Sequence, residues 1–194
     1  MEEKYFEKFF LFFNSIYQIE IEILQEYYSQ WDLLSIPPKT ILTESGNIQK
    51  NMYFVLEGVQ KSYQYSSEKA QIVEFTYFPS LSGIPDSFVL QTPSKYFLET
   101  VSQSLLLTIS YNKHESFMAK YRKIETLFRK ITEQILFMVI DRQYDLNALD
   151  MKSRFESLIR KRPELLYLVT RKDLASYLRI DPTNLSKLIK TVKL

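Results

Sequence analysis

The sequence contains no cysteine among its 194 residues, and it has only three glycines, one histidine and one tryptophan. Without cysteine the chain can form no disulfide, no thiolate zinc site, no cysteine-ligated iron–sulfur cluster and no cysteine nucleophile. The scarcity of glycine and the lack of Gly/Ser or charged low-complexity tracts argue against long disordered linkers. These absences exclude several classes of sensor and enzyme, and they fit a cytoplasmic protein.

No segment has the pattern of a membrane span. The strongly apolar run at residues 9–13 is far shorter than the roughly 18 residues that a spanning helix needs. Glu2, Glu3 and Glu7 precede this run, where a signal peptide would carry positive charge. We therefore expect a cytoplasmic protein that has no membrane partner.

An enzyme is the competing class, because small β-rolls also occur as metal-dependent enzymes. Their metal sites usually need two or three histidines with a carboxylate, whereas the single histidine here, His114, lies at the start of an expected helix. We find no paired nucleophile and base, phosphate-binding loop or dinucleotide fingerprint. We expect no catalytic residues, no metal and no cofactor.

Helical and strand patterns occupy different parts of the chain. Apolar residues at spacings of three and four predict helix over residues 2–34. From Thr40 to about Ser110, β-branched and aromatic runs are broken by turn residues, with Gly46 and Gly58 at two of the turns. Short strands at this spacing predict an antiparallel roll or sandwich.

A long helix is expected over about residues 115–145, with Asn112 at its start. Its apolar residues alternate at spacings of four and three, which is the seam of a coiled coil over about three heptads. The seam comprises Phe117, Tyr121, Ile124, Phe128, Ile131, Ile135 and Met138. The pattern favours dimerisation, and the alternative is one wide buried face on a monomer. Residues 147–150 then read as a hinge, after which Asp150 caps one helix and Pro163 opens a short one.

The last quarter of the chain has the pattern of a helix-turn-helix. Thr170 and Asp181 can each cap a helix, and Pro182 suits the first helical position after Asp181. Two short capped helices joined by three or four residues are typical of this motif. The expected buried stripes are Leu174, Ala175 and Leu178 in the first helix, and Leu185, Leu188 and Ile189 in the second.

Charge separates this region from the rest of the chain. Residues 151–194 hold 11 Lys and Arg against 4 Asp and Glu, while residues 1–150 hold 14 against 19. A basic helix-turn-helix suits a polyanion, and the major groove of B-DNA admits one helix. The alternative is a helical hairpin with a solvated basic face.

The order of these elements resembles the Crp/Fnr family of transcription regulators. The resemblance covers about residues 40–194 and rests on YFVLEGVQKSY at 53–63 and, most specifically, on RKDLASYLRIDPTNLSKLIK at 171–190. It implies an α+β chain: an N-terminal antiparallel β-roll of the cyclic-nucleotide-binding (jelly-roll) type flanked by helices, a long dimerisation helix and a C-terminal helix-turn-helix. The implied domains are a sensor at 1–146 and a DNA-binding domain at 147–194.

The resemblance also implies which residues contact DNA. The recognition helix would be residues 182–193, with Thr183 and Lys187 at base-reading positions and Asn184 at a phosphate contact. The expected DNA-binding set is Thr183, Asn184, Ser186, Lys187 and Lys190. Because Pro182 and Thr183 replace the Arg and Glu base readers of the cyclic AMP receptor protein, its target sequence cannot be carried over. The implied partners are an imperfect palindrome of double-stranded DNA and a second copy of the chain, with RNA polymerase a further candidate.

The expected effector pocket departs from the family pattern. Relatives that bind cyclic AMP have a ribose-binding Glu after the loop glycine and a phosphate-binding Arg eleven residues beyond that glycine. Here Ile84 follows Gly83, and the Arg position falls on Ser94, with Lys95 pointing to the opposite face of the strand. A buried phosphate would lose a charge-assisted contact. The candidate pocket residues are Gly83, Ile84, Asp86, Ser87, Ser94 and Lys95, and ordinary loop polarity is the alternative explanation for the polar ones.

The sequence therefore predicts a homodimeric, sequence-specific transcription regulator that does not depend on cyclic AMP. The alternative is a dimeric small-molecule-binding protein whose DNA-binding domain has degenerated. Pro182 keeps this alternative open, as does Arg179, which replaces the turn glycine usual in the family.

Overall fold

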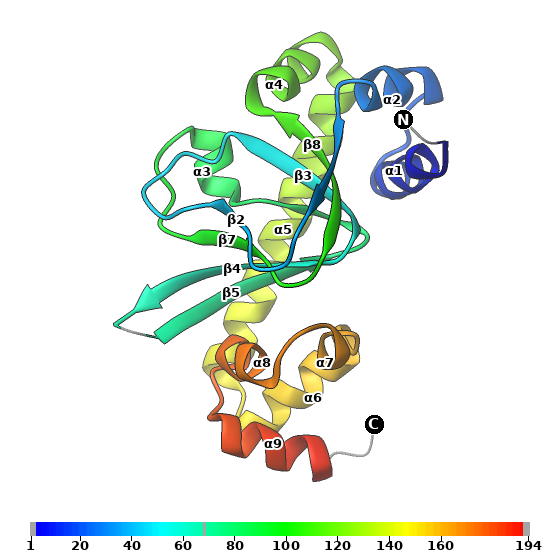
Figure 1. Ribbon diagram of the computed structural model, residues 1–194. Coiled ribbons are helices and arrows are strands. Elements are labelled where there is room, and N and C mark those ends of the chain that lie inside the picture. The colour runs from blue at the N-terminus through cyan, green and yellow to red at the C-terminus, as the bar shows by residue number, and fades with distance from the viewer. Residues whose placement is uncertain (1–2, 68, 192–194) are drawn as a thin grey trace. The chain divides into compact units, whose positions relative to one another are not determined.

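The computed structural model describes residues 3–67 and 69–191, which divide into two compact units (Figure 1). The roll unit comprises residues up to 62 and residues 75–134, and the C-terminal unit comprises residues 63–74 and those from 135 onward. This division falls inside the long helix, whereas the sequence suggested 146/147. The reason is that Arg142 and Asp145 of this helix hydrogen-bond to residues of the C-terminal helices.

The described strands form two four-stranded sheets, with strand orders β1-β8-β3-β6 and β2-β7-β4-β5. Antiparallel pairing joins β8 to both β1 and β3, β3 to β6, and β2 to β7, so the expected antiparallel roll is confirmed. The strands are β1 Asp32–Ile36, β2 Ile41–Thr43, β3 Asn51–Glu57, β4 Val59–Ser66, β5 Lys69–Tyr77, β6 Ser80–Ser82, β7 Phe97–Thr100 and β8 Ser104–Ser110. A short helix, α3 (Pro85–Leu90), lies in the segment that the sequence marked as a loop.

The sequence predicts helix over residues 2–34, but the N-terminal region does not form one helical stretch. It forms α1 (Glu3–Ile16) and α2 (Ile21–Tyr28), and the carboxamide oxygen of Asn14 accepts a hydrogen bond from the Ile19 amide at 2.9 Å between them. Residues 32–36 then form β1, because they pair with residues 104–108 of β8. This long-range pairing overrides the local helical pattern.

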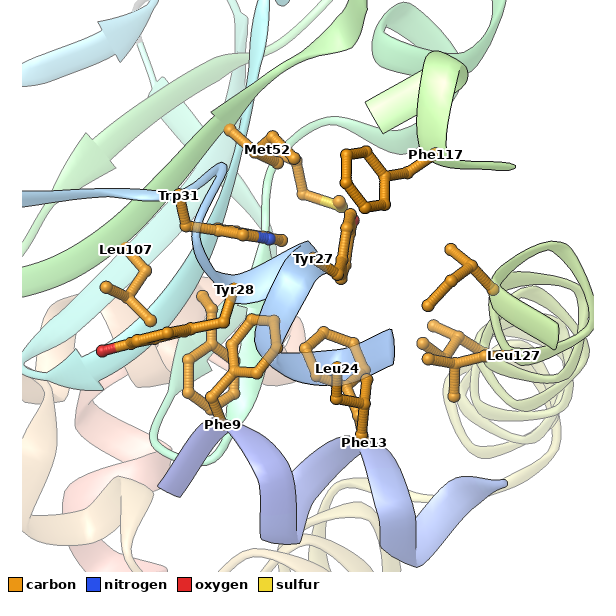
Figure 2. Packing of buried hydrophobic residues seen from close by; sticks show 14 of the residues in the cluster. Phe9, Phe13, Leu24, Tyr27, Tyr28, Trp31, Met52, Leu107, Phe117 and Leu127 are labelled. Carbon is orange, nitrogen blue, oxygen red and sulfur yellow. The ribbon is translucent and has the colours of Figure 1, made fainter. Parts of the chain in front are cut away.

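An aromatic cluster forms the main core of the roll unit (Figure 2). Phe9 of α1 lies at its centre, with ring centroids 4.5 Å from Phe13 and 5.4 Å from Trp31. Tyr27 of α2 meets Trp31 edge to face at 5.7 Å. Each such pair contributes about 0.5–1.5 kcal/mol beyond the burial of its area. The phenylalanine-rich N-terminal helix is therefore a structural part of the roll.

The central strand β3 separates this cluster from a second one. Its even-numbered residues Met52, Phe54 and Leu56 belong to the aromatic cluster, whereas Tyr53 and Val55 belong to an aliphatic cluster on the other face. Alternation with period two therefore fills both sides of the strand. The turn into β4 needs Gly58, whose φ is +87°, because an added Cβ would lie 2.4 Å from the Gln103 carbonyl oxygen.

The expected helix over residues 115–145 is two helices. Helix α4 (Tyr111–Lys120) is capped by the Ser110 hydroxyl rather than by Asn112, and α5 (Arg122–Ala148) follows after Tyr121 takes an extended conformation. Several residues of the predicted seam pack into the aromatic cluster of the same chain: Phe117, Tyr121, Ile124, Phe128 and Ile131. For this part of the seam, the alternative of a buried intramolecular face is confirmed.

The C-terminal unit contains α6 (Met151–Lys161), α7 (Leu165–Leu168), α8 (Arg171–Leu178) and α9 (Pro182–Thr191), as well as the second half of α5. Helix α7 begins two residues later than the sequence suggested from Pro163. The fully buried apolar side chains of these helices are Phe155, Leu165, Leu174, Ala175 and Leu185. Within residues 3–67 and 69–191, no helix is long and apolar enough to cross a membrane.

The single histidine provides a prediction for acid stability. Burial lowers the pKa of His114 from 6.5 to about 4, and its Nδ1 lies 2.8 Å from the Tyr27 hydroxyl. The unfolded chain therefore binds a proton near pH 6.5 that the folded chain does not bind until about pH 4. We expect the free energy of unfolding to fall by about 1.4 kcal/mol for each pH unit below 6.5.

Urea denaturation at pH 7, 6 and 5 measures this slope, and H114Q removes the only imidazole. The variant should lose stability much less steeply than the wild-type protein over this range. An equal slope in both proteins would assign the acid sensitivity to other groups.

Candidate nucleic-acid interface

Helices α8 and α9 form the predicted helix-turn-helix, with both caps in place. The Thr170 hydroxyl accepts a hydrogen bond from the Asp173 amide at 3.1 Å. The Asp181 carboxylate accepts the amides of Thr183 at 2.8 Å and Asn184 at 3.4 Å, and Pro182 is the first residue of α9. Each cap satisfies amides that have no partner inside their helix.

The turn between the helices is tight and carries a strained residue. Arg179 has φ 52° and ψ 46°, the left-handed conformation that glycine adopts without cost. A side chain here costs about 1 kcal/mol. The amide of Ile180 donates to the Ala175 carbonyl at 3.0 Å, and both side chains are buried. Arg179 therefore does not prevent the turn. The hydrogen bond from Ile180 to Ala175 closes it, and bonds of this kind end many helices.

Three of the predicted DNA-binding residues share the solvent side of α9. Thr183, Lys187 and Lys190 are exposed, and at about 100° per residue they lie within roughly 60° of one another on the helix surface. Leu185, the fully buried residue of α9, lies on the opposite side. Among the described residues, neither lysine forms an ion pair. Their charges are available to a polyanion.

The other two predicted residues flank this stripe. Ser186 is half-buried and its hydroxyl donates to the Pro182 carbonyl at 2.9 Å, which directs it along its own helix. Asn184 is half-buried and its amide nitrogen lies 3.9 Å from the sulfur of Met151 in α6. Both residues therefore lie at the edge of the exposed face. Lys193, the last residue of the expected recognition helix, is outside the described residues.

Sequence reasoning missed a second pair of cations, at the start of α8. Arg171 and Lys172 are exposed and occupy its first turn, next to the cap residue Thr170. Positive charge is unfavourable at this end of a helix, which attracts anions instead. Two cations beside free amides favour a phosphate contact. The signal was present in the sequence, as two basic residues directly after a cap.

The predicted effector residues are engaged by their own chain. Ile84 is 2% exposed and packs in the aliphatic cluster with Tyr53, Val55 and Leu98. Ser94 is buried, and its hydroxyl donates to the Tyr96 carbonyl at 2.8 Å and accepts the Tyr96 amide at 2.9 Å. Apolar packing and a closed hydrogen-bond pair within the chain therefore occupy both predicted positions.

The remaining four residues of that set do not converge on a cavity. The Ser87 hydroxyl donates to the Thr92 carbonyl at 2.6 Å and accepts the Gln49 amide at 3.0 Å. A Cβ on Gly83 would lie 3.2 Å from the Gln49 side chain, while Asp86 and Lys95 are exposed. A groove of about 730 Å³ in the same unit is lined by residues between 41 and 53 and by Pro93, and by none of the predicted six. In the part of the chain that the structure describes, no group of three or more His, Asp or Glu side chains could hold a metal ion.

Comparison with known proteins finds similarity in structure only. No protein-family model and no curated protein matches the sequence. The structure of FixK2 from Bradyrhizobium japonicum is 14% identical, with a TM-score of 0.73 over 82% of this chain and 83% of that one.

Two further solved structures extend the similarity over more of the chain. The c-di-GMP-responsive global regulator CLP from Xanthomonas campestris is 15% identical, with a TM-score of 0.67 over 88% and 90% of the two chains. A putative cAMP-binding regulatory protein from Silicibacter pomeroyi is 15% identical, with a TM-score of 0.67 over 95% and 87%.

These similarities span both the roll and the helix-turn-helix. The resemblance noted in the sequence is thereby confirmed in structure: the chain has the fold of the Crp/Fnr-family regulators.

Proposed function

We propose that this protein is a homodimeric, sequence-specific DNA-binding transcription regulator of the Crp/Fnr type, located in the cytoplasm. The observation that carries the proposal is the capped helix-turn-helix, whose second helix exposes Thr183, Lys187 and Lys190 opposite its buried stripe. A helix of this kind fits the major groove, where a lysine can donate to guanine O6 or N7 or to a phosphate. RNA polymerase is a further proposed partner, on the resemblance alone.

The proposed mode of binding places α9 along base edges and the start of α8 at the sugar-phosphate backbone. Arg171 and Lys172 would contact phosphates, which fix register without reading sequence. In a two-fold dimer, two α9 helices about 34 Å apart meet successive major grooves, so the expected target is an imperfect palindrome.

Homodimerisation is supported by the second half of α5. Residues 135–140 are six consecutive apolar side chains, each between 37% and 74% exposed. A helix that is apolar on every side is normally buried on every side. Phe137, Ile140 and the following Tyr144 are 74%, 57% and 62% exposed, and they recur at spacings of three and four on the side opposite the buried residue Ile131. We propose that these three form the dimer contact, which shifts it from the sequence-based seam through Ile135 and Met138.

Independence from cyclic AMP is supported by the packing of the roll. Ile84 and Ser94 replace the ribose-binding and phosphate-binding residues of relatives that bind cyclic AMP, and both are buried and engaged. A nucleotide phosphate in the roll would meet no guanidinium at Ser94.

Two residues of the helix-turn-helix favour an alternative function. Pro182 cannot donate to a base, and Arg179 strains the turn. A dimeric small-molecule-binding protein with a degenerate DNA-binding domain would carry such changes. The DNA-binding measurement below separates the two functions.

A binding selection from pooled genomic fragments, at moderate salt and without added nucleotide, should enrich a site with two-fold symmetry. On that site, K187A and K190A should each weaken binding. Each should also reduce the slope of the logarithm of the binding constant against the logarithm of the salt concentration, by about 1 for each phosphate that a protomer no longer neutralises. The control is K120A, which removes an exposed lysine of α4 in the roll unit that pairs with Glu26. Failure to enrich any site with folded dimer, with and without cell extract, would favour the degenerate alternative.

The dimer contact is tested by F137E and I140E, which place charge on the proposed seam. Both variants should shift the protein from dimer to monomer in sedimentation velocity at micromolar concentration, because a carboxylate buried between two helices is unpaired. The matched control is L11E, at a residue of α1 that is 60% exposed. A wild-type monomer, or dimers in both seam variants, would contradict the assignment.

Titration calorimetry with cyclic AMP and cyclic GMP tests the roll pocket. We expect no saturable heat with either nucleotide at concentrations up to the millimolar range. Stoichiometric binding at micromolar concentration would show that the roll opens around Ile84 and Ser94.

A further inference from the structure

A cleft of about 240 Å³ lies within the C-terminal unit, between the second half of α5 and helices α6 and α8. None of the residues assigned above to DNA or to the roll pocket lines it. Its apolar lining includes Met138, Leu146, Leu158 and Leu178. The volume corresponds to about eight water molecules at roughly 30 Å³ each. A small organic molecule fits this space.

The carboxylates of the cleft are already paired. Lys161 donates to Asp145 at 2.9 Å and also to Asp141. Arg162 donates to Glu74, which lies on β5 in the same unit. These two cations therefore account for all three acidic side chains that line the cleft.

Two guanidinium groups that line the cleft, those of Arg142 and Arg154, form no ion pair with a carboxylate among the described residues. Arg142 stacks 4.1 Å from the centre of the Tyr177 ring, and its Nη2 donates to the Tyr177 carbonyl at 2.9 Å. Arg142 and Arg154 thus bring positive charge to the cleft that no described carboxylate neutralises.

The net charge of the lining defines the missing partner. Four cations, Arg142, Arg154, Lys161 and Arg162, face three carboxylates, which leaves a charge of +1. A carboxylate carries one negative charge and can accept two parallel hydrogen bonds from a guanidinium. An inorganic phosphate ion would bring more charge and nothing to cover the leucines and Met138.

We propose that this cleft binds a small monocarboxylate with an apolar body. Its carboxylate would neutralise the positive charge that Arg142 and Arg154 bring to the cleft, and its apolar part would cover Leu158, Leu178 and Met138. The same unit carries the proposed dimer stripe on α5 and the helix-turn-helix on α8 and α9. A ligand bridging α5, α6 and α8 would stabilise their mutual packing, which is how a small molecule could act on this unit. The binding itself does not depend on the proposed DNA function.

Titration calorimetry at pH 7 with butyrate, hexanoate and benzoate tests the site on the full chain. At least one of these should bind with one site per protomer, and the neutral amide of the same acid should bind at least tenfold more weakly. R154M should weaken carboxylate binding at least tenfold. K152M, which removes a charge from the exposed side of the same helix, should change it less than twofold.

L146W provides a second variant that fills the cleft without altering charge, and it should abolish binding in a protein whose thermal unfolding remains cooperative. Undiminished binding in both R154M and L146W would overturn the site. Absence of binding by all three carboxylates would overturn the ligand class. If inorganic phosphate then bound in a way that depends on Arg154, the cleft would be an anion site of another class. Each of these results is independent of whether the protein binds DNA.

Discussion

The hydrogen bonds that Lys161 donates to Asp141 and Asp145 join α6 to the second half of α5 within the C-terminal unit. Partial burial alone would raise the pKa of Asp145, but hydrogen bonds from Lys161 and Ser157 hold it below its ordinary value. The pair therefore stays charged at neutral pH and below. The apolar residues 135–140 of the same helix remain largely exposed. In the proposed dimer this part of α5 would supply the contact with the partner.

Helix α8 is held in this unit by β5 as well as by the helices. The Ser176 hydroxyl donates to the Ala70 carbonyl at 2.9 Å and accepts the Ile72 amide at 3.0 Å, so that it pairs with the backbone of β5 as a neighbouring strand would. Arg142 of α5 binds the far end of α8 at Tyr177. Since α9 packs on α8, the exposed stripe of α9 is fixed relative to α5 inside one unit. In the proposed dimer, a symmetric pair of α5 helices would therefore set the spacing of the two α9 helices, as the proposed palindromic site requires.

Local chemistry could be predicted from the sequence, whereas the choice of partner surfaces could not. The caps at Thr170 and Asp181 depend on neighbouring residues, and the structure confirms both. The alternation from Phe117 to Met138 identified an apolar stripe but not its partner, because a heptad pattern is the same whether a helix packs on its own chain or on another. Strand β1 was missed because its conformation depends on pairing with β8, more than 60 residues away. The cleft at Arg154 depends on side chains from three helices and a strand, a combination that no spacing in the sequence reveals.

The packing of Ile84 supports the proposal that the roll does not respond to cyclic AMP. Here the position is filled by a side chain whose burial stabilises the roll by about 1.5–3 kcal/mol without any ligand. Ligand binding can shift a conformational equilibrium only by its differential affinity for the two states. In the proposed function, a roll that is already stable without a ligand would offer a nucleotide little such difference. In the proposed cleft a carboxylate would offer a larger difference, because the charge of Arg142 and Arg154 would be neutralised only when the ligand is bound.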